Sequence, residues 1–343
     1  MGTRVSVVGA TGYSGGELVA LLARHPRADV AGLFSSGGAR SGASVPFERL
    51  HPSLRGRSGP GARPFSVPEV LADRPEVVFL ATPNEVSAEA AGPLVAGGAK
   101  VVDVSGAFRL RDASLYPAWY GFTHPSPELL AEAVYGLTEW CGEELDRARL
   151  VANPGCYPTS VLLALKPLKG LLDLSAPLVC DSKSGVSGAG KKADVAFSFA
   201  ELSGNFKAYG VGSHRHEPEM RQELGVPADA PFSFVPHLLP VVRGILSTLH
   251  VVFTRPVTAG EVTDLFAASY AAAPLVSVLP AGSLPELCDV AGTPRAAIGF
   301  VLLAGGRRAV VVSAIDNLLK GAASQALQNF NRLSGYPETE GLS

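Results

Sequence analysis

The stretch Val5-Ser6-Val7-Val8-Gly9-Ala10-Thr11-Gly12-Tyr13-Ser14-Gly15 decides how the chain begins to fold. Residues 5–8 predict a short buried strand, and residues 17–24 predict a helix with an apolar stripe. Between them, three glycines spaced Gly-x-x-Gly-x-x-Gly let the backbone turn sharply and approach a pyrophosphate at the helix N-terminus, where N–H groups bind anions. This context predicts a Rossmann-type dinucleotide site rather than an ordinary glycine-rich turn. Its expected cofactor-binding residues are Gly9, Thr11, Gly12, Tyr13, Ser14 and Gly15.

Strands and helices continue to alternate after this turn. Residues 85–96 predict an alanine-rich helix, and three further apolar segments predict strands. Strand and helix repeated in this way indicate a parallel sheet with helices on both faces. The predicted strands are 29–34, 76–81 and 100–104.

The pattern changes near residue 160. A helix is predicted over 161–172, and the β-rich stretches 232–235 and 244–253 follow without an intervening helix, which indicates an antiparallel or mixed sheet. The sequence thus predicts an α/β protein with an N-terminal Rossmann-type parallel sheet and a second α+β domain. A last helix, 316–333, is placed back against the first domain. The expected domains are 1–152 plus 316–343 for the cofactor, and 153–315 for catalysis, substrate and dimerisation.

The composition limits the kinds of partner. The 343 residues are 47% hydrophobic and carry a formal net charge of −2, so the chain can bury a core and has no basic excess for nucleic acid or an anionic membrane. No apolar run reaches the ~20 residues that span a bilayer. Met1-Gly2-Thr3-Arg4 leads into a strand without a signal-peptide pattern. The four cysteines lack zinc-site spacing, so we expect no metal, and a reducing cytoplasm.

The end of the second strand indicates which dinucleotide binds. NAD sites place a carboxylate there for the ribose 2′-hydroxyl. This strand ends Phe34-Ser35-Ser36-Gly37-Gly38-Ala39-Arg40, with hydroxyls and an arginine but no carboxylate. Such residues suit a 2′-phosphate, so Ser35, Ser36 and Arg40 predict NADP(H), with a polar surface loop as the alternative.

Cys156 lies in Val151-Ala152-Asn153-Pro154-Gly155-Cys156-Tyr157-Pro158-Thr159, just before a helix predicted to begin near Thr159. A helix N-terminus stabilises a thiolate, and its amides can hold the oxyanion of an attacked carbonyl. Cys156 is therefore predicted to be a catalytic nucleophile rather than a buried structural cysteine.

A thiolate that attacks an acyl group needs an acid or base nearby. His214 and His216 flank Arg215, and alternate residues of an extended segment face the same way, so both can point into one cleft. The sequence favours His214 as the base. His216 lies nearer the helix start at Pro218, where the helix dipole opposes a protonated imidazole.

Three segments have the composition of anion sites. Residues 182–192 are rich in glycine, serine and lysine, although they lack the Walker A spacing. Arg109 and Arg243 stand beside turn or strand residues, and arginine is the natural bidentate partner of carboxylate or phosphate. Solvent-facing salt bridges are the alternative for both arginines.

From residue 9 to about 330 the chain resembles the N-acetyl-γ-glutamyl-phosphate reductase family. The resemblance is specific because the cysteine, histidine and C-terminal motifs occur together and in the family's order. Three positions depart from the family's pattern, at Asn84, Pro158 and Thr293-Pro294, and none of them lies in the cysteine or histidine motif. The matching stretches are 9–18, 103–110, 135–139, 153–157, 184–190, 214–219, 240–245 and 316–323.

The resemblance implies NADPH-dependent reduction of an acyl phosphate to N-acetyl-L-glutamate 5-semialdehyde, through a cysteine thioester, in arginine biosynthesis. It implies that Cys156 is the nucleophile and that His214 and His216 form the acid/base region. It also implies a small-molecule substrate, inorganic phosphate as co-product, and a homo-oligomer, dimer or tetramer. Further cofactor contacts are expected at Pro83, Ser187, Gly188 and Asn317, and substrate contacts at Ser105, Arg109, Glu139, Asn153, Ser184 and Arg243.

Other activities fit parts of this pattern. Aspartate-semialdehyde dehydrogenase performs the same chemistry on a shorter acyl phosphate, and a lysine-pathway reductase acts on carrier-bound aminoadipyl phosphate. A dinucleotide-sensing protein without catalysis is a third alternative, against which Cys156 and the two histidines argue.

Overall fold

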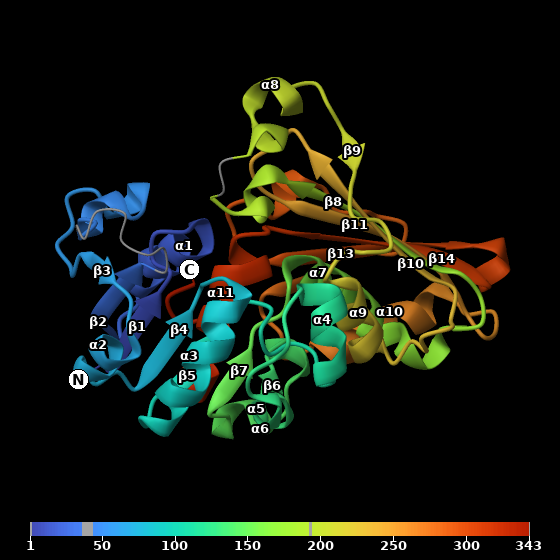
Figure 1. Cartoon of the computed structure of the whole chain (residues 1–343). Helices are drawn as coiled ribbons and strands as arrows, with labels where there is room; N and C mark the ends of the chain where they lie inside the picture. The colour runs from blue at the N-terminus through green and yellow to red at the C-terminus, as the bar shows by residue number, and fades with distance from the viewer. Residues whose placement is uncertain (1, 36–43, 192–193, 343) are drawn as a thin grey trace. The chain divides into compact units, whose positions relative to one another are not determined.

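The computed structural model describes residues 2–35, 44–191 and 194–342. The chain divides into two compact units, each containing a seven-stranded sheet (Figure 1). Unit 1 comprises Met1–Gly155 and Ala322–Ser343, and unit 2 comprises Cys156–Gly321. Within the described ranges, no helix is both long enough and apolar enough to cross a membrane.

The sheet of unit 1 has the strand order β3-β2-β1-β4-β5-β7-β6, and its neighbouring strands pair in parallel. This confirms the predicted Rossmann-type sheet. The strands are β1 Thr3–Val8, β2 Ala28–Ser35, β3 Ala62–Pro64, β4 Val77–Leu80, β5 Lys100–Asp103, β6 Val134–Tyr135 and β7 Leu150–Ala152. The helices are α1 Tyr13–Leu22, α2 Val67–Ala72, α3 Asn84–Ala96, α4 Tyr116–Tyr120, α5 Pro127–Glu132, α6 Glu144–Arg147 and α11 Ser324–Leu333.

The helix α11 belongs to unit 1 and is buried although much of it is polar. Asn329 explains how: its Nδ2 donates to the carbonyl of Gly136 at 2.8 Å, and its Oδ1 accepts from Thr138 Oγ1 at 2.7 Å. The helix predicted over 316–333 is in fact a π-helical turn, Leu319–Ala323, followed by α11. Burying side-chain amides costs little free energy when they are hydrogen-bonded in this way, and the bonds fix the position of the helix.

The sheet of unit 2 has the order β12-β13-β14-β11-β8-β10-β9 and is mixed, because β8 pairs with β10 in parallel while β11 pairs with β8 and β14 antiparallel. The predicted α+β second domain with a mixed sheet is thus confirmed. The strands are β8 Leu178–Gly185, β9 Lys207–Ala208, β10 Phe232–Leu239, β11 Ile245–Val252, β12 Val276–Val278, β13 Ala296–Leu303 and β14 Arg308–Ile315. The helices are α7 Cys156–Leu165, α8 Phe199–Leu202, α9 Glu217–Leu224 and α10 Ala259–Tyr270.

The helix α7 begins at Cys156, earlier than the sequence predicted. Pro158 is the third residue of the helix, and proline is tolerated in a first turn because the N–H groups there have no intrahelical partner. The α-helical part ends at Leu165, and residues 166–171 continue as a 3₁₀ helix. The early start places the thiol in the first turn of a helix that packs on β11 and β14.

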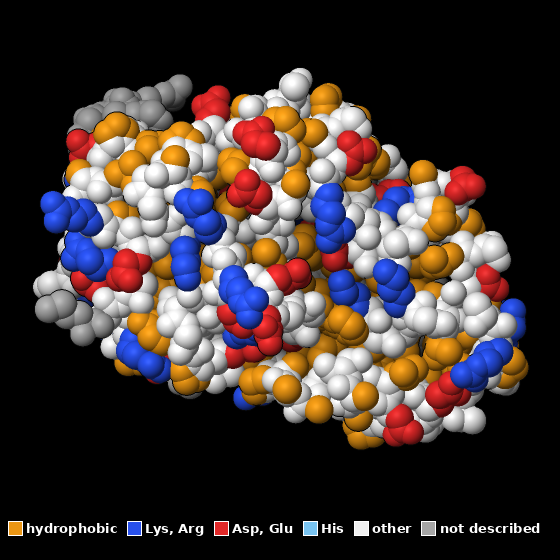
Figure 2. All heavy atoms as spheres, turned by 90° about the horizontal axis from the view of Figure 1, so that it is seen from below, with side chains coloured by type: hydrophobic (Ala, Val, Ile, Leu, Met, Phe, Trp, Pro, Cys, Tyr) orange, Lys and Arg blue, Asp and Glu red, His pale blue; other side chains and the backbone are white. Residues whose placement is uncertain are grey.

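Charges on the surface are mixed in sign. On the face seen in Figure 2, basic and acidic side chains are intermixed, in keeping with the net charge of −2. That face offers no broad basic field of the kind that binds a polyanion.

Candidate active site

The predicted nucleophile is placed at a helix N-terminus within unit 2. Cys156 is the first residue of α7, is half-buried, and is a thiol rather than part of a disulfide. The unsatisfied N–H groups of the first helical turn stabilise negative charge, which favours a thiolate and an oxyanion at the same place.

Gly321 packs directly against the cysteine backbone. A β-carbon placed on Gly321 would lie 2.8 Å from Cys156 Cβ and 3.3 Å from Cys156 Cα. The Gly321 N–H donates to the carbonyl of Asp316 at 2.9 Å, within a π-helical turn of the kind often found at functional sites. The close approach of these two backbones requires a residue without a side chain.

We predict that Gly321→Ala slows both turnover and iodoacetamide alkylation of Cys156 by ~10- to 100-fold, because the added methyl must displace the nucleophile. Gly170→Ala is the matched control, since Gly170 has no atom within 4 Å of such a β-carbon. Wild-type alkylation in the Gly321 variant would contradict the prediction.

The two predicted histidines meet around the residue that follows the cysteine. The ring of Tyr157 lies 5.6 Å from that of His214 and 5.9 Å from that of His216, in edge-to-face contact with both, and the two imidazoles are 4.8 Å apart. His216 caps α9, which begins at Glu217 with Pro218 in its first turn, as the sequence predicted. Both predicted histidines therefore contact Tyr157, the residue that follows Cys156 in the first turn of α7.

His214 has a defined tautomer. The backbone N–H of His216 donates to His214 Nδ1 at 3.2 Å, so the proton of the neutral ring is on Nε2. Burial, together with the charge of Arg215, lowers the pKa of His214 to about 4, which keeps the ring neutral at physiological pH.

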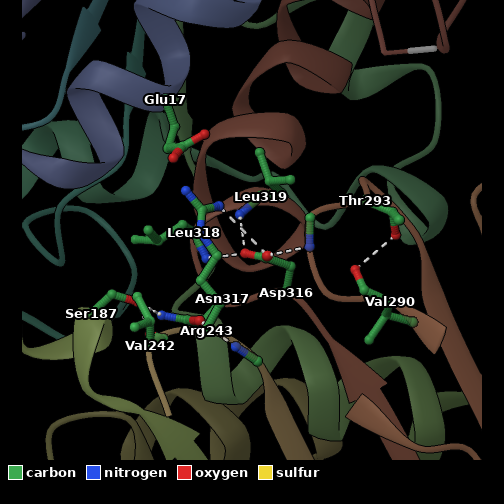
Figure 3. Close-up of polar contacts among 12 residues, drawn as sticks. Glu17, Ser187, Val242, Arg243, Val290, Thr293, Asp316, Asn317, Leu318 and Leu319 are labelled. Atoms are coloured by element: carbon green, nitrogen blue, oxygen red, sulfur yellow. Dashed lines mark hydrogen bonds and ion pairs between the residues drawn. The ribbon is translucent and has the colours of Figure 1, made fainter. Parts of the chain in front are cut away.

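Arg243, predicted to bind an anion, lies beside a buried carboxylate of the same unit. Its Nη1 is 3.6 Å from Asp316 Oδ2 (Figure 3). Asp316 Oδ1 accepts hydrogen bonds from the N–H groups of Leu318 at 2.8 Å and Leu319 at 3.0 Å, and Oδ2 accepts one from Gly292 at 2.8 Å. Because Asp316 is fixed, it positions the guanidinium, whose side chain remains 28% exposed.

Asn317 connects the neighbouring loops of unit 2. Its Oδ1 accepts from the N–H of Gly244 at 2.8 Å, and its Nδ2 donates to Ser187 Oγ at 2.8 Å (Figure 3). Ser187 Oγ in turn donates to the carbonyl of Val242 at 2.6 Å. Asn317 and Ser187 were predicted to contact the cofactor, and in this structure their side chains connect the loop that carries Arg243 to the turn after β8.

Ser184 and Gly188 lie next to this network. Ser184 is buried, and its Oγ donates to the carbonyl of Gly185 at 2.9 Å. A β-carbon on Gly188 would lie 3.1 Å from Ser184 Oγ. The small residues of segment 182–192 thus allow the turn Val186–Ala189 to pack tightly.

The glycine turn of unit 1 has the geometry that the sequence predicted. Gly9 adopts φ +87°, and a β-carbon there would lie 2.1 Å from the carbonyl oxygen of Ala81. Gly15 is equally confined, since its β-carbon would lie 2.1 Å from Gly9 O. At Gly12 the atom nearest to such a β-carbon is Gly9 O at 3.4 Å, an ordinary contact, so this position is less confined than the other two. Thr11, Tyr13 and Ser14 belong to this turn and the start of α1.

Pro83 and Ser35 follow strands that flank the turn. Pro83 caps α3 after β4, the strand paired with β1, and Ser35 ends β2 on the other side of β1. Ser35 Oγ donates to the carbonyl of Arg63 at 3.4 Å. Ser36 and Arg40 lie outside the described residues.

Two predicted substrate residues of unit 1 form part of its framework. Asn153 is fully buried, its N–H donates to the carbonyl of Asp103 at 2.8 Å, and its Oδ1 accepts from Asn329 Nδ2 at 3.1 Å. The guanidinium of Arg109 donates through Nε to the Asn153 carbonyl at 2.8 Å and through Nη2 to the Val104 carbonyl at 2.8 Å. These contacts fix the segment that leads into Cys156.

The other two predicted substrate residues of unit 1 are also bonded within it. Ser105 Oγ donates to Asp103 Oδ2 at 2.9 Å. Glu139 Oε1 accepts from Gln328 Nε2 at 3.1 Å.

Sequence reasoning missed residues that shape the site. Tyr157 and Gly321 stood inside motifs, but their roles depend on packing against His214 and Cys156 respectively. The sequence did hold a signal for Asp316, because this carboxylate directly precedes Asn317, a predicted cofactor contact. Among the described residues, no cluster of histidine, cysteine and carboxylate side chains could hold a metal.

Both units match family models of known proteins. Residues 4–148 match the family model "Semialdehyde dehydrogenase, NAD binding domain", and residues 156–317 match "Semialdehyde dehydrogenase, dimerisation domain". The chain is 45% identical to N-acetyl-gamma-glutamyl-phosphate reductase of Pelotomaculum thermopropionicum, covering 100% of this chain and 98% of the relative. It is 48% identical to the reductase of the same name from Ectopseudomonas mendocina, covering 99% and 98%.

Solved structures share the fold at lower identity. A probable aspartate-semialdehyde dehydrogenase from Pseudomonas aeruginosa superposes with a TM-score of 0.72 at 23% identity, over 97% of this chain and 99% of that one. Aspartate semialdehyde dehydrogenase II from Vibrio cholerae gives 0.71 at 19%, over 98% and 99%. These likenesses concern the fold, whereas the near relatives identify the family. The chain belongs to the N-acetyl-γ-glutamyl-phosphate reductase family.

Proposed function

We propose that this chain reduces N-acetyl-γ-glutamyl phosphate to N-acetyl-L-glutamate 5-semialdehyde with NADPH, in arginine biosynthesis. The observation that carries the proposal is Cys156 at the first turn of α7, followed by Tyr157, whose ring contacts His214 and His216. The similarity to N-acetyl-gamma-glutamyl-phosphate reductases, together with this thiol, supports a catalytic role for the chain rather than dinucleotide sensing. A reaction that needs a reduced thiol suits the cytoplasm.

The reaction divides into acyl transfer and reduction. The histidine pair takes the Cys156 proton, the thiolate attacks the acyl carbon, and the carbon–oxygen bond to phosphate breaks, leaving a thioester. The proton returns to the departing phosphate, which Arg243 binds. The chemistry that NADPH supplies when bound is a hydride for the thioester carbon. The carbon–sulfur bond then breaks, the aldehyde leaves, and a proton delivered through the histidine pair restores the thiol.

The predicted residues have different parts in this proposal. Unit 1 holds the cofactor through the turn at Gly9 to Gly15, and unit 2 performs the chemistry. Arg243, positioned by Asp316, is the phosphate contact. Arg109 and Asn153 act instead on the position of the segment before Cys156.

The test is an assay in the reverse direction, with NADP⁺, inorganic phosphate and N-acetylglutamate semialdehyde. We expect NADPH to form only when all three are present. Aspartate semialdehyde and the carrier-bound aminoadipate semialdehyde serve as comparison substrates. A higher kcat/KM for either of them would show that the proposed substrate is wrong. The absence of turnover with all three semialdehydes would exclude a phosphorylating aldehyde oxidoreductase.

The same assay tests the cofactor preference. We predict that Ser35→Asp, and equally Arg40→Glu, raises the KM for NADP far more than that for NAD, because an introduced carboxylate repels the 2′-phosphate. Ser53→Asp, on an exposed turn of unit 1, is the control. Equal changes for the two cofactors would show that these residues do not contact the phosphate.

We also propose that the chain is a homo-oligomer, a dimer or a tetramer. In unit 2, α7 packs on one face of the sheet, while alternate residues of β8 on the other face are half-exposed. Val195 and Phe199 of the same unit are 76% and 86% exposed, and an interface through this surface would cover them. Light scattering should give a molecular mass that is a multiple of the 35.5 kDa of one chain. The substitution Phe199→Asp should lower this mass. A monomeric wild type would refute the proposal.

A further inference from the structure

The ring of His214 is contacted by three other aromatic rings of unit 2. Tyr157, Tyr209 and Phe234 have ring centroids 5.6, 5.6 and 5.3 Å from that of His214. Their planes make angles of 87°, 67° and 82° with the imidazole, so each contact is edge-to-face, the arrangement that aromatic quadrupoles favour. We call these three residues the aromatic box.

Tyr209 closes the box from a surface segment. It follows the short strand β9, which pairs with β10, and its N–H donates to the carbonyl of Pro236 at 3.0 Å. Tyr209 is 37% exposed, whereas Tyr157 is buried. Tyr209 is therefore the most exposed member of the box.

The hydroxyls of Tyr157 and Tyr209 connect these two rings of the box by a hydrogen bond. The Tyr157 hydroxyl donates to the carbonyl of His237 at 3.2 Å, which uses its only proton. The Tyr209 hydroxyl, 3.0 Å from that of Tyr157, must then be the donor in the bond between them. The resulting chain from Tyr209 through Tyr157 to a β10 carbonyl has a single direction and fixes both rings.

We propose that Tyr209 is a positioning residue of the active site: its hydrogen bond to Tyr157 closes the aromatic box and holds His214 as a fixed Nε2–H donor. The backbone N–H of His216 already occupies His214 Nδ1, so only Nε2 can face a ligand. The inference deepens the proposed function and rests on it for the role of the thiol.

The charged and titratable groups around the box are Arg215, His216, Cys156 and the two tyrosines. Burial and the charge of Arg215 oppose protonation of His214, and the ring of His216 adds a second imidazole at 4.8 Å. Burial raises the pKa of both tyrosines, that of Tyr209 to about 12, and a charge on Cys156 raises both further. The two hydroxyls therefore stay protonated.

The experiment compares Tyr209→Phe, Tyr209→Leu and the control Phe206→Leu. Phe206 belongs to the same segment, but its ring contacts His237 instead, at 5.0 Å. We would titrate the His214 ring by NMR and measure the pH profile of iodoacetamide alkylation of Cys156, neither of which needs a substrate. In Tyr209→Leu we expect the His214 pKa to rise from about 4 toward 6.5, with a new step in the alkylation profile in that range. Tyr209→Phe should give a smaller shift.

Turnover provides the second measurement. We expect Tyr209→Leu to lower kcat by ~10-fold with little change in KM, less than the loss of a whole acid/base group. An unchanged His214 titration and alkylation profile in Tyr209→Leu would overturn the proposal, as would the same shifts in Phe206→Leu. Because titration and alkylation are read without substrate, they remain decisive even if the proposed reaction is wrong.

Discussion

Replacing Cys156 with serine is expected to lower kcat by ~10³-fold or more while NADPH binding is unchanged. A serine hydroxyl is far less ionised than a thiol at neutral pH and is a much poorer nucleophile, even at a helix N-terminus. The substitution hardly changes size, so the contact with Gly321 and the start of α7 are preserved. Steady-state turnover and titration of NADPH fluorescence measure the two quantities separately.

A second cysteine of unit 2 provides the control for this experiment. Cys288 is exposed, and a hydrogen bond to the carboxylate of Glu286 raises its pKa, so it is a poor nucleophile outside the predicted site. Cys288→Ser should retain wild-type turnover. Activity of Cys156→Ser within tenfold of wild type would exclude a covalent thioester.

The sequence predicted those features whose cause is local. The strand, glycine turn and helix at the N-terminus follow from periodicity and from backbone conformations that only glycine adopts, as Gly9 at φ +87° illustrates. The change from a parallel to a mixed sheet followed from the loss of alternating helices. The position of Cys156 at the start of a helix was predictable because a helix N-terminus leaves a signature within a few residues.

The features that sequence could not provide depend on contacts between distant segments. Tyr209 reaches His214 because the two-residue strand β9 pairs with β10, and such a short strand has no periodic signal. Gly321 packs on Cys156 only because the chain returns after β14. Arg109 illustrates the converse: an arginine beside a turn suggests an anion site, but its guanidinium binds backbone carbonyls once the loop is folded.

The division of labour between the two histidines is the second prediction with a large expected effect. Position in the sequence favoured His214 as the base. The contacts favour the opposite assignment, because His214 Nδ1 accepts the N–H of His216 and burial lowers the His214 pKa to about 4. A ring whose Nε2 carries the proton and whose charged form is strongly disfavoured donates a hydrogen bond well but accepts a thiol proton poorly.

We therefore predict that His216→Gln lowers kcat by ~10²- to 10⁴-fold and slows alkylation of Cys156 at neutral pH, as expected for loss of a general base. His214→Gln should lose less than about tenfold, because the glutamine Nε2 still donates where the imidazole Nε2–H did. Glutamine cannot take a proton at either position, so the pair of variants separates donor from base. A larger loss in His214→Gln would return the base to His214. If neither variant loses more than about threefold, the proton is handled elsewhere and the two imidazoles serve the packing around Tyr157.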